Sequence, residues 1–533
     1  MNAQQMTQDQ LLEFLQDLLD QPDLEVNDDL FGLGLTSLQL MVVQERILKE
    51  CGVCIELQDM FTNHTVGKLA ALIEQTSPSV EAGASAPMRV SAGTYPASPA
   101  QTRMYVMAAM DPGTVGFNMP EATRIVGPTS LDDLEAAVWT LHRRHESLHT
   151  RFAMKDELFQ IIDPSLTPMI VKRTGKAAEF SMMAREFIAP FDLLTGPLYR
   201  VLLFEVSDDD HYVFLDIHHI IADGWSLARY FTELLALIEG NPLSPLPYQY
   251  KDYVMRRRKQ MAPADLTARY EETTRVQELG PIPGLELPTD WARPPIRSCN
   301  GARVARHVSI DLLDQLARFG SARDMTTHMV LMAAFSAVLQ RWSGQRDFAI
   351  GCPNAGRDTR DFEQVVGMFV NMTVNRIAIA ENATFEDLLR GVRTACLASL
   401  KNSDIEFNDL VDWLHVQRNP ARNPVFDYVF AYQNVDIPSM TLANHSLRIY
   451  EFDYRISRFD MFLSFMRIEN DLRVLLEYST DLFLPATAED FVDDVLEAAK
   501  MMCNSPTAFI ADLPVRRTRK TVATAPVIPT FSF

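Results

Sequence analysis

Long apolar runs are missing from this sequence of 533 residues. None approaches the ~18 consecutive apolar residues that suggest a membrane-spanning helix. The first ten residues, MNAQQMTQDQ, contain neither the basic nor the apolar part of a secretory signal peptide. These absences predict a cytoplasmic protein that has no membrane partner.

Basic charge and cysteine are also scarce. Lys and Arg together number 49 against 70 Asp and Glu, which gives a net charge of −21. Binding to nucleic acid needs patches of Lys and Arg that this balance does not supply, so we expect no such partner. The six cysteines are scattered, and Cys51 and Cys54 form a CxxC pair with no second pair to complete a zinc site. We therefore predict free thiols in a reducing compartment and no bound metal.

A stretch of small residues and prolines at 77–94 divides the chain. Its sequence, SPSVEAGASAPMRVSAGT, offers little to bury and predicts a flexible linker. Upstream, residues 1–76 contain 13 acidic and 3 basic side chains, a net charge of −10. Apolar residues recur there at helical spacing within 11–19, 38–48 and 66–73. The pattern predicts a small acidic helical bundle.

The rest of the chain alternates between two kinds of segment. Strand-like runs such as LYRVLLFEV at 198–206 are followed by long amphipathic segments such as HMVLMAAFSAVLQRW at 328–342. This alternation predicts an α/β architecture. Residues 279–295 hold five prolines and little periodicity, so they are expected to cross between two lobes. The predicted boundaries are a first lobe at 95–275, a second lobe at 276–515 and a tail at 516–533.

Ser37 stands where a glycine-containing loop meets an amphipathic segment, in NDDLFGLGLTSLQLMVVQERI. A serine in this position often serves only as a helix N-cap. The unpaired amides and dipole of a helix N-terminus also favour an anionic group such as a phosphodiester. The residues alone are consistent with both roles.

This segment resembles the attachment motif of carrier proteins. The matching positions are Asp28 or Asp29, Phe31, Gly34, Ser37 and Leu38. The resemblance implies a four-helix peptidyl carrier domain that bears 4'-phosphopantetheine on Ser37, attached by a phosphopantetheinyl transferase. Gly-Leu-Thr replaces the Gly-Gly-His that is common in peptidyl carriers, which leaves peptidyl and acyl cargo open.

Two adjacent histidines end the apolar run in HYVFLDIHHIIADG, residues 211–224. Side chains alternate along a strand, so His218 and His219 are expected to face opposite sides and to do different work. Asp223 and Gly224 follow where a helix is expected to begin. Taken alone, the pair is as consistent with satisfied polar groups at a strand end as with a catalytic centre.

The segment HHIIADG resembles the H-H-x-x-x-D-G motif of acyl-thioester transferases, which include chloramphenicol acetyltransferase and the condensation domains of nonribosomal peptide synthetases. Six further segments resemble the condensation branch and follow its order: YPASPAQTRMYVM, RRHESLHTRF, IGCPNAGRD, VGMFVNMTVNR, NSDIEFNDLV and RNPARNPVFDYVFAYQN. The resemblance implies two chloramphenicol-acetyltransferase-like α/β lobes in a V shape. Carrier-bound arms would enter a tunnel between them from opposite faces.

The reaction implied is aminolysis of a donor thioester by the amine of an acceptor aminoacyl thioester. The second histidine of the motif, His219, is the residue that the family uses in catalysis, while His218 is expected to hold the turn. Asp223 is expected to form a structural ion pair with an arginine. We predict Arg341 as its partner, with Arg357 as the alternative.

The sequence also gives expectations for five other positions in or near these motifs. Gly224 is expected to allow close backbone approach or a positive φ where an arm passes. Trp225 and Ser226 are expected to pack against and cap the following helix. His149 stands where the family usually has arginine, so no catalytic role is assigned to it. Asn371 lies in a family motif near the expected tunnel.

The order of the domains predicts that the arm on Ser37 is the donor. The expected partners are an upstream adenylation domain and a downstream acceptor carrier protein, with aminoacyl or peptidyl thioesters as substrates. The motif IHHIIADGWS favours an L-configured donor. Two alternatives stay open: an epimerase, which shares the histidine motif and also follows a carrier, and a recruitment platform that has kept the fold without catalysis.

Overall fold

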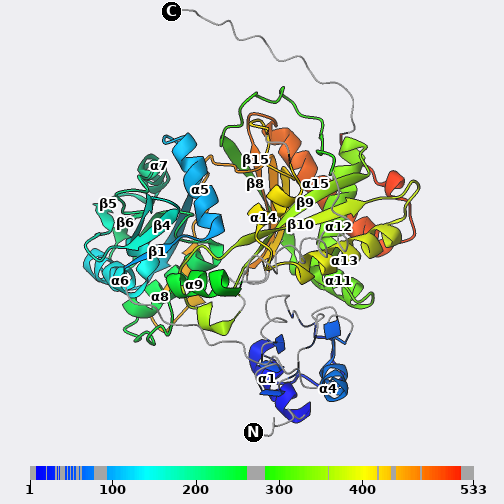
Figure 1. The fold of residues 1–533 in the computed structure, drawn as a ribbon, viewed down its shortest axis with the longest axis horizontal. Helices are drawn as coiled ribbons and strands as arrows, with labels where there is room; N and C mark the ends of the chain where they lie inside the picture. The colour runs from blue at the N-terminus through cyan, green and yellow to red at the C-terminus, as the bar shows by residue number, and fades with distance from the viewer. Residues whose placement is uncertain are drawn as a thin grey trace, which may run out of the picture.

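The computed structural model describes most of the chain after residue 92 and parts of the chain before it (Figure 1). The described residues are 8–19, 21–30, 33, 35, 43–44, 46–47, 50–51, 53, 55, 59–60, 63–76, 93–260, 282–357, 359–416, 419–433, 440–468 and 471–517. Ser37 and the residues 77–92 of the predicted linker lie outside them. None of the helices in these ranges combines the length and hydropathy required to span a lipid bilayer.

The amino-terminal region contains helices α1 (Gln8–Leu19) and α4 (Val66–Gln75). Both coincide with segments of predicted helical spacing, and the third such segment, 38–48, falls mostly outside the described residues. Leu11 and Leu15 of α1 are buried, as are Leu69 and Ile73 of α4. Burial of one apolar face on each helix stabilises the pair, because each large aliphatic side chain removed from water contributes ~1.5–3 kcal/mol.

The first lobe is built on a six-stranded sheet. Its strand order is β12 (Met440–Thr441), β13 (Ser446–Ile449), β2 (Asn118–Val126), β7 (Asp210–His218), β6 (Tyr199–Ser207) and β5 (Met169–Thr174). A smaller sheet has the order β1 (Thr94–Pro96), β4 (Leu158–Ile162) and β3 (Thr150–Met154). The helices are α5 (Pro99–Met110), α6 (Leu131–Arg144), α7 (Ala177–Phe187), α8 (Gly224–Ile238), α9 (Tyr250–Gln260) and the short η1 (Glu146–His149).

Strand β7 leads to the histidine motif and lies between β2 and β6, antiparallel to both. Its residues from His211 to His218 are all buried, because both faces of the sheet are covered. Leu215 and Ile217 pack in one hydrophobic cluster with residues of α6 and α8, whereas Tyr212 and Phe214 pack in another with residues of α7. The predicted alternation of side chains along this strand is confirmed.

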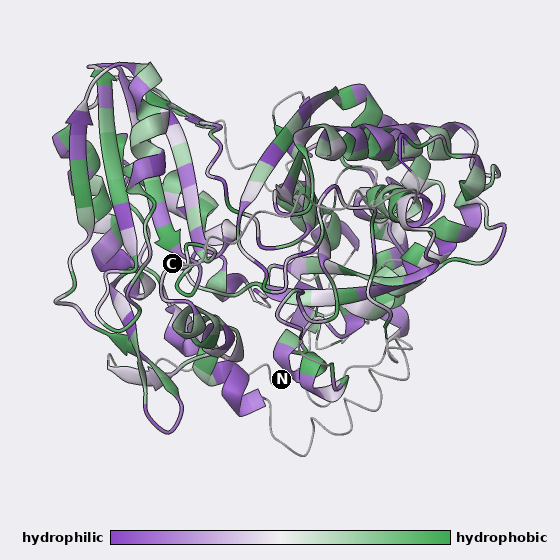
Figure 2. Ribbon diagram, turned by 90° about the horizontal axis from the view of Figure 1, so that it is seen from above, coloured by the Kyte–Doolittle hydropathy of each residue, from purple (hydrophilic) through white to green (hydrophobic). Residues whose placement is uncertain are grey.

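The second lobe is built on another six-stranded sheet, beside the first lobe in Figure 1. Its strand order is β10 (Asn371–Ala378), β9 (Asp347–Asn354), β11 (Tyr428–Gln433), β14 (Met461–Ile468), β15 (Asp471–Ser479) and β8 (Gly301–Ser309). The helices are α11 (Ile310–Ser321), α12 (Thr327–Ser343), α13 (Phe385–Lys401), α14 (Phe407–Trp413), α15 (Pro485–Asn504), η2 (Arg360–Phe362) and η3 (Ile510–Asp512). The helix ribbons carry both hydrophilic and hydrophobic residues, as expected for helices with one face on a sheet (Figure 2).

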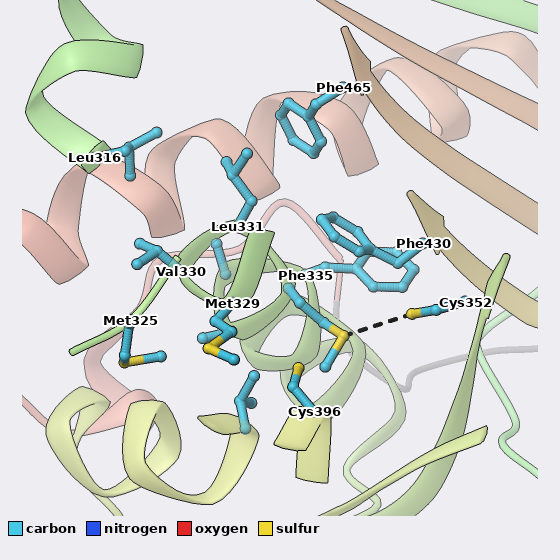
Figure 3. Packing of buried hydrophobic residues seen from close by; sticks show 14 of the residues in the cluster. Leu316, Met325, Met329, Val330, Leu331, Phe335, Cys352, Cys396, Phe430 and Phe465 are labelled. Carbon is cyan, nitrogen blue, oxygen red and sulfur yellow. Dashed lines mark hydrogen bonds between the residues drawn. The ribbon is translucent and has the colours of Figure 1, made fainter. Parts of the chain in front are cut away.

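Helix α12 forms the centre of the second lobe. Thr326 caps its first turn by accepting a hydrogen bond from the amide of Met329 at 3.3 Å, and Gly344 ends it in the left-handed conformation with φ 74°. Phe335, near the middle of α12, lies with its ring centroid 5.7 Å from that of Phe430 on β11 (Figure 3). This packing fixes the helix against the sheet whose loops reach the first lobe.

The two lobes are not contiguous in sequence. Strands β12 and β13 belong to the part of the chain predicted for the second lobe, yet β13 pairs with β2 of the first-lobe sheet through Ser446 and Val126. The ends of the predicted segments also differ: Thr94 already belongs to β1, and Arg517 at the start of the predicted tail pairs with Asp290 at 2.6 Å. The boundaries predicted from the sequence did not include this exchange of strands.

Candidate active site

The two histidines occupy different environments where β7 ends. His218 is the last residue of the strand and is 3% exposed, whereas His219 begins the turn and is partly exposed. The backbone amide of His218 donates to Leu198 O at 2.9 Å, and that of His219 donates to Phe117 O at 2.8 Å. The residues just before β6 and β2 therefore fix the two backbones independently, and His219 is the more exposed of the two histidines.

The imidazole of His219 is held in one tautomer. Its Nδ1 lies 2.8 Å from Ala222 O. A carbonyl oxygen can only accept, so Nδ1 carries the proton and Nε2 keeps its lone pair. Burial, and then the positive charge of Arg458, lower the pKa of His219 to about 4. At neutral pH the residue is thus a neutral imidazole with a free acceptor nitrogen.

His218 is engaged in holding the turn. Its Nδ1 accepts a hydrogen bond from the amide of Ile220 at 3.1 Å, and its ring lies between those of Phe117 and Phe191, with centroids 6.0 and 6.1 Å away. Burial lowers the pKa of His218 to about 3, with smaller contributions from His219 and Arg458. A neutral ring with one nitrogen bonded inside its own turn is suited to a structural role.

Asp223 forms the predicted ion pair, but with Arg357. The guanidinium of Arg357 donates to Asp223 Oδ2 at 2.8 Å and to Oδ1 at 3.1 Å, and both side chains are buried. The predicted partner Arg341 is wrong: it lies in the last turn of α12 and donates to Leu513 O at 3.2 Å. Arg357 reaches the first lobe because the chain turns toward that lobe after β9.

The Asp223 carboxylate is also the N-cap of α8. It accepts hydrogen bonds from the amide of Ser226 at 2.8 Å, from Ser226 Oγ at 2.7 Å and from the amide of Phe369 at 3.1 Å. Burial alone would raise the pKa of Asp223, but Arg357 and the two hydrogen bonds from Ser226 lower it below its ordinary value. The helix cap expected at Ser226 is therefore provided by Asp223, with Ser226 bonded to it.

The segment that carries Arg357 is fastened to the first lobe over residues 363–368. Trp225 Nε1 donates to Glu363 O at 2.8 Å, and Ser226 Oγ accepts from the amide of Gly367 at 3.0 Å. Tyr250 Oη donates to Met368 O at 2.7 Å. This docked segment makes the turn after β7 part of an interface between the lobes.

Gly224 is the first residue of α8 and does not have a positive φ. A Cβ built on it would meet no heavy atom within 4 Å. Neither a strained turn nor close backbone approach within the protein requires glycine here. The open space beside Gly224 is the feature that is compatible with passage of an arm.

Two other motif positions are structural. His149 is buried and its Nδ1 donates to His142 O at 2.9 Å. The side-chain amide of Asn371 donates to Ser403 O and Ile405 O and accepts from the amide of Phe407 at 3.1 Å. Asn371 therefore organises the loop before α14.

A buried carboxylate that no sequence motif marks lies on the same strand as His218. Asp216, two residues before His218 on β7, accepts a hydrogen bond from Asn118 Nδ2 at 2.9 Å and lies 3.4 Å from Arg200 Nε. Burial raises the pKa of Asp216 to about 7, an effect that Arg200 and Asn118 partly offset. The signal was present, since an Asp inside an otherwise apolar strand needs partners when buried.

The attachment position for phosphopantetheine lies just beyond a described loop. The amide of Leu35 donates to Leu30 O at 2.8 Å, the amide of Leu33 donates to Asp29 O at 3.1 Å, and both Leu30 and Leu35 are buried. These hydrogen bonds hold the chain at Leu35, two residues before Ser37. Ser37 itself lies outside the described residues.

Comparisons with known proteins match both parts of the chain. Residues 91–521 match the model of the condensation domain, and residues 9–73 match that of the phosphopantetheine attachment site. The chain belongs to the condensation-domain family. It is 34% identical to surfactin synthase subunit 1 of Bacillus subtilis (strain 168) over 487 residues, which are 91% of this chain and 14% of that protein. It is also 32% identical to tyrocidine synthase 3 of Brevibacillus parabrevis over 504 residues, which are 94% of this chain and 8% of that protein.

Solved structures share the fold of the condensation domain. The X-domain from teicoplanin biosynthesis is similar with a TM-score of 0.72 and 21% identity, over 81% of this chain and 100% of that chain. A four-domain nonribosomal peptide synthetase bound to AMP and glycine is similar with a TM-score of 0.71 and 18% identity, over 80% of this chain and 34% of that chain. The protein is thus a carrier domain followed by a condensation domain, and it spans a small part of the length of its synthetase relatives.

Proposed function

We propose that His219 promotes peptide bond formation by orienting the amine of an acceptor aminoacyl thioester and accepting its proton at Nε2. The observation that carries the proposal is the tautomer: Nδ1 donates to Ala222 O, so Nε2 of this partly exposed residue has its lone pair available to accept a proton. A well-placed proton acceptor contributes ~10²–10⁴-fold to a rate. A C–N bond forms to the donor carbonyl carbon, the donor C–S bond breaks, and the proton held by His219 is available to the leaving thiolate.

We propose Ser37 as the attachment point of the donor arm. When attached, 4'-phosphopantetheine supplies a terminal thiol that carries an acyl group as a thioester. The carrier domain precedes the condensation domain, which is the order expected of a donor. On this proposal a phosphopantetheinyl transferase modifies Ser37, an upstream adenylation domain loads it, and a downstream carrier protein brings the acceptor.

The finer architecture is part of the same proposal. We propose that the carrier domain is a four-helix bundle, of which α1 and α4 are described, and that the two condensation lobes form a V with a tunnel between them. This proposal is supported by the contacts of Asp223 with Arg357 and of Trp225 with Glu363, which join the histidine turn to the second lobe.

A recruitment platform is the second candidate function. One solved structure of similar fold is the complex of an X-domain with OxyB from teicoplanin biosynthesis, with a TM-score of 0.72 and 21% identity. A recruitment platform would need only a surface that binds its partner. This chain also has a neutral His219 whose Nε2 can accept a proton, which a platform does not need. Loss of amide formation on replacing His219 therefore separates the two functions.

The test is to load the chain at Ser37 with an aminoacyl-pantetheine and to add a carrier protein loaded with a second amino acid. We expect an amide-linked product on the added carrier, identified by mass, and no product from Ser37→Ala. Incubation of the loaded chain without acceptor should leave the configuration of the Cα unchanged. Racemised Cα without acceptor would assign the chain to epimerases, and binding of a partner without any product would assign it to platforms.

The pH dependence of amide formation should reflect the pKa of the acceptor amine and not that of His219. Burial and then the positive charge of Arg458 lower the pKa of His219. The negative charge of Asp223, which is paired with Arg357, raises it, and the resulting pKa is about 4. An α-amine has a pKa of about 7.7–8.0. We expect single-turnover rates to fall about tenfold per pH unit below that range, with no inflection near ~6.5, the ordinary pKa of histidine. An inflection near that value would show that His219 is not held neutral.

Folding stability should fall in acid because the pKa values of both histidines are lowered in the folded protein. His218 and His219 have pKa values of about 3 and about 4, below the ordinary value of about 6.5. The unfolded chain therefore binds more protons than the folded chain between about pH 6.5 and pH 3, which lowers stability as pH falls through this window. Denaturant unfolding of wild type and His218→Asn at pH 7 and pH 5 should show a smaller acid loss for the variant. An equal loss would contradict a neutral buried His218.

Substitutions at Gly224 should separate passage of an arm from folding. Because a Cβ there meets nothing within 4 Å and φ is not positive, Gly224→Ala should leave the melting temperature unchanged and reduce the rate little. Gly224→Trp should also fold but should reduce amide formation at least tenfold by filling the open space. Equal rates for both variants would show that no arm passes beside Gly224.

A further inference from the structure

Arg458 lies in the second lobe, in the loop before β14, and its side chain extends into the first lobe. Its Nε donates to Gly116 O at 2.8 Å and its terminal nitrogen donates to Asn118 O at 2.8 Å. The residue between these two carbonyls is Phe117, whose own carbonyl accepts the backbone amide of His219 at 2.8 Å. One arginine of the second lobe thus clamps the three-residue segment that holds His219.

The main chain of Arg458 is anchored within its own lobe. Its amide lies 3.4 Å from Glu477 Oε1 on β15, and its carbonyl oxygen accepts from Asn423 Nδ2 at 3.2 Å and from the guanidinium of Arg297. The side chain therefore cannot follow the first lobe if the lobes move apart. Any such movement would stretch the hydrogen bonds to Gly116 and Asn118.

The clamped segment is also directly paired with the catalytic strand. Asn118 is the ladder partner of His218, and its side chain donates to Asp216 Oδ2 at 2.9 Å. Asn118 thus contacts Arg458 through its backbone carbonyl and Asp216 through its side-chain amide. A shift of Arg458 would therefore be passed to β7 through backbone pairing and through a buried side chain.

We propose that Arg458 is a positioning residue for His219, which links the separation of the two lobes to the placement of the catalytic imidazole. The proposal rests on the proposed role of His219 in peptide bond formation. Arg458 also brings a positive charge to both histidines, which adds to the effect of burial in disfavouring their protonation. The other charged group that faces His219 is Asp223, and Arg357 pairs with it.

The test compares Arg458→Gln and Arg458→Lys with the control Arg185→Gln. Arg185 on α7 also donates to a backbone carbonyl that is distant in sequence, Asp453 O at 3.1 Å. Unlike Arg458, Arg185 is exposed and is not among the groups that shift the pKa of either histidine. Two quantities are measured on the full chain. They are the pKa of His219 by NMR of labelled histidine without substrates, and the single-turnover rate of amide formation between loaded carriers.

Arg458→Gln should raise the pKa of His219 from about 4 toward the ordinary value of about 6.5, and should slow amide formation about 10- to 100-fold. Arg458→Lys keeps the charge but cannot make both hydrogen bonds, so it should leave the pKa near 4 and still slow the reaction. Arg185→Gln should change neither quantity. If Arg458→Gln does not fold, Arg458→Lys tests the proposal instead: a slower reaction with the pKa of His219 still near 4 supports it.

Unchanged pKa and rate in Arg458→Gln, or equal effects in Arg185→Gln, would overturn the proposal. A lysine variant with wild-type rate would show that charge alone matters and that the clamp does not. If the NMR shift appears while the wild type forms no amide, the link between Arg458 and His219 stands and the proposed function of His219 fails.

Discussion

Replacing His219 with alanine is expected to slow amide formation between two loaded carriers by about 10²–10⁴-fold. The variant removes the neutral Nε2 that would orient the amine and accept its proton. Folding should survive, because the ring is partly exposed and its one hydrogen bond among the described residues is to the nearby Ala222 O. The rate is measured in a single turnover by quenched mass spectrometry, with the melting temperature as the check on folding.

His307 provides a matched control for this substitution. It lies on β8 with a side chain that is 53% exposed, so His307→Ala removes an imidazole far from the motif. We expect no change in rate or melting temperature. A wild-type rate in His219→Ala would exclude catalysis by His219 and would favour either the recruitment platform or a mechanism that only positions the two loaded arms.

Replacing Asp223 with alanine is expected to lower the free energy of unfolding by about 3–5 kcal/mol and to reduce soluble yield. The substitution leaves the Arg357 guanidinium buried without its carboxylate and removes the N-cap of α8. It also leaves the amide of Phe369 without its acceptor. Denaturant unfolding measures the loss.

Two companion variants sharpen this prediction. Arg341→Gln should be close to wild type, because Arg341 is not the partner of Asp223 and donates to Leu513 O. The double variant Asp223→Ala with Arg357→Met should be more stable than Asp223→Ala alone, since no unpaired charge stays buried. If Asp223→Ala folds normally and loses only turnover, Asp223 has a chemical role and the structural assignment is wrong.

Local patterns in the sequence predict the histidine pair well. Alternation predicts different environments for His218 and His219, and the structure gives them different environments, although β7 ends at His218 and His219 begins the turn. The period of two is a property of the strand backbone itself, so it needs no tertiary information. The α/β architecture follows from the same kind of pattern.

The contacts between lobes could not be predicted in this way. Asp223 and Arg357 are 134 residues apart, and Arg341 stands before β9 just as Arg357 stands after it. Only the return of the chain to the first lobe after β9 distinguishes them. The pairing of β13 with β2 likewise depends on the path of the chain between the lobes. The contacts of Arg458 with the first lobe could not be predicted either, because no sequence motif marks this residue.

The measurement that tests the account most directly is the direction of transfer between two intact proteins. The chain is loaded at Ser37 with an isotopically labelled aminoacyl group, mixed with a separately loaded acceptor carrier, and both masses are followed. Our account predicts that the labelled group leaves this chain and appears on the acceptor as an amide, and that His219→Ala retains it. Transfer of the acceptor's group onto this chain, or no transfer in the wild type, would contradict it.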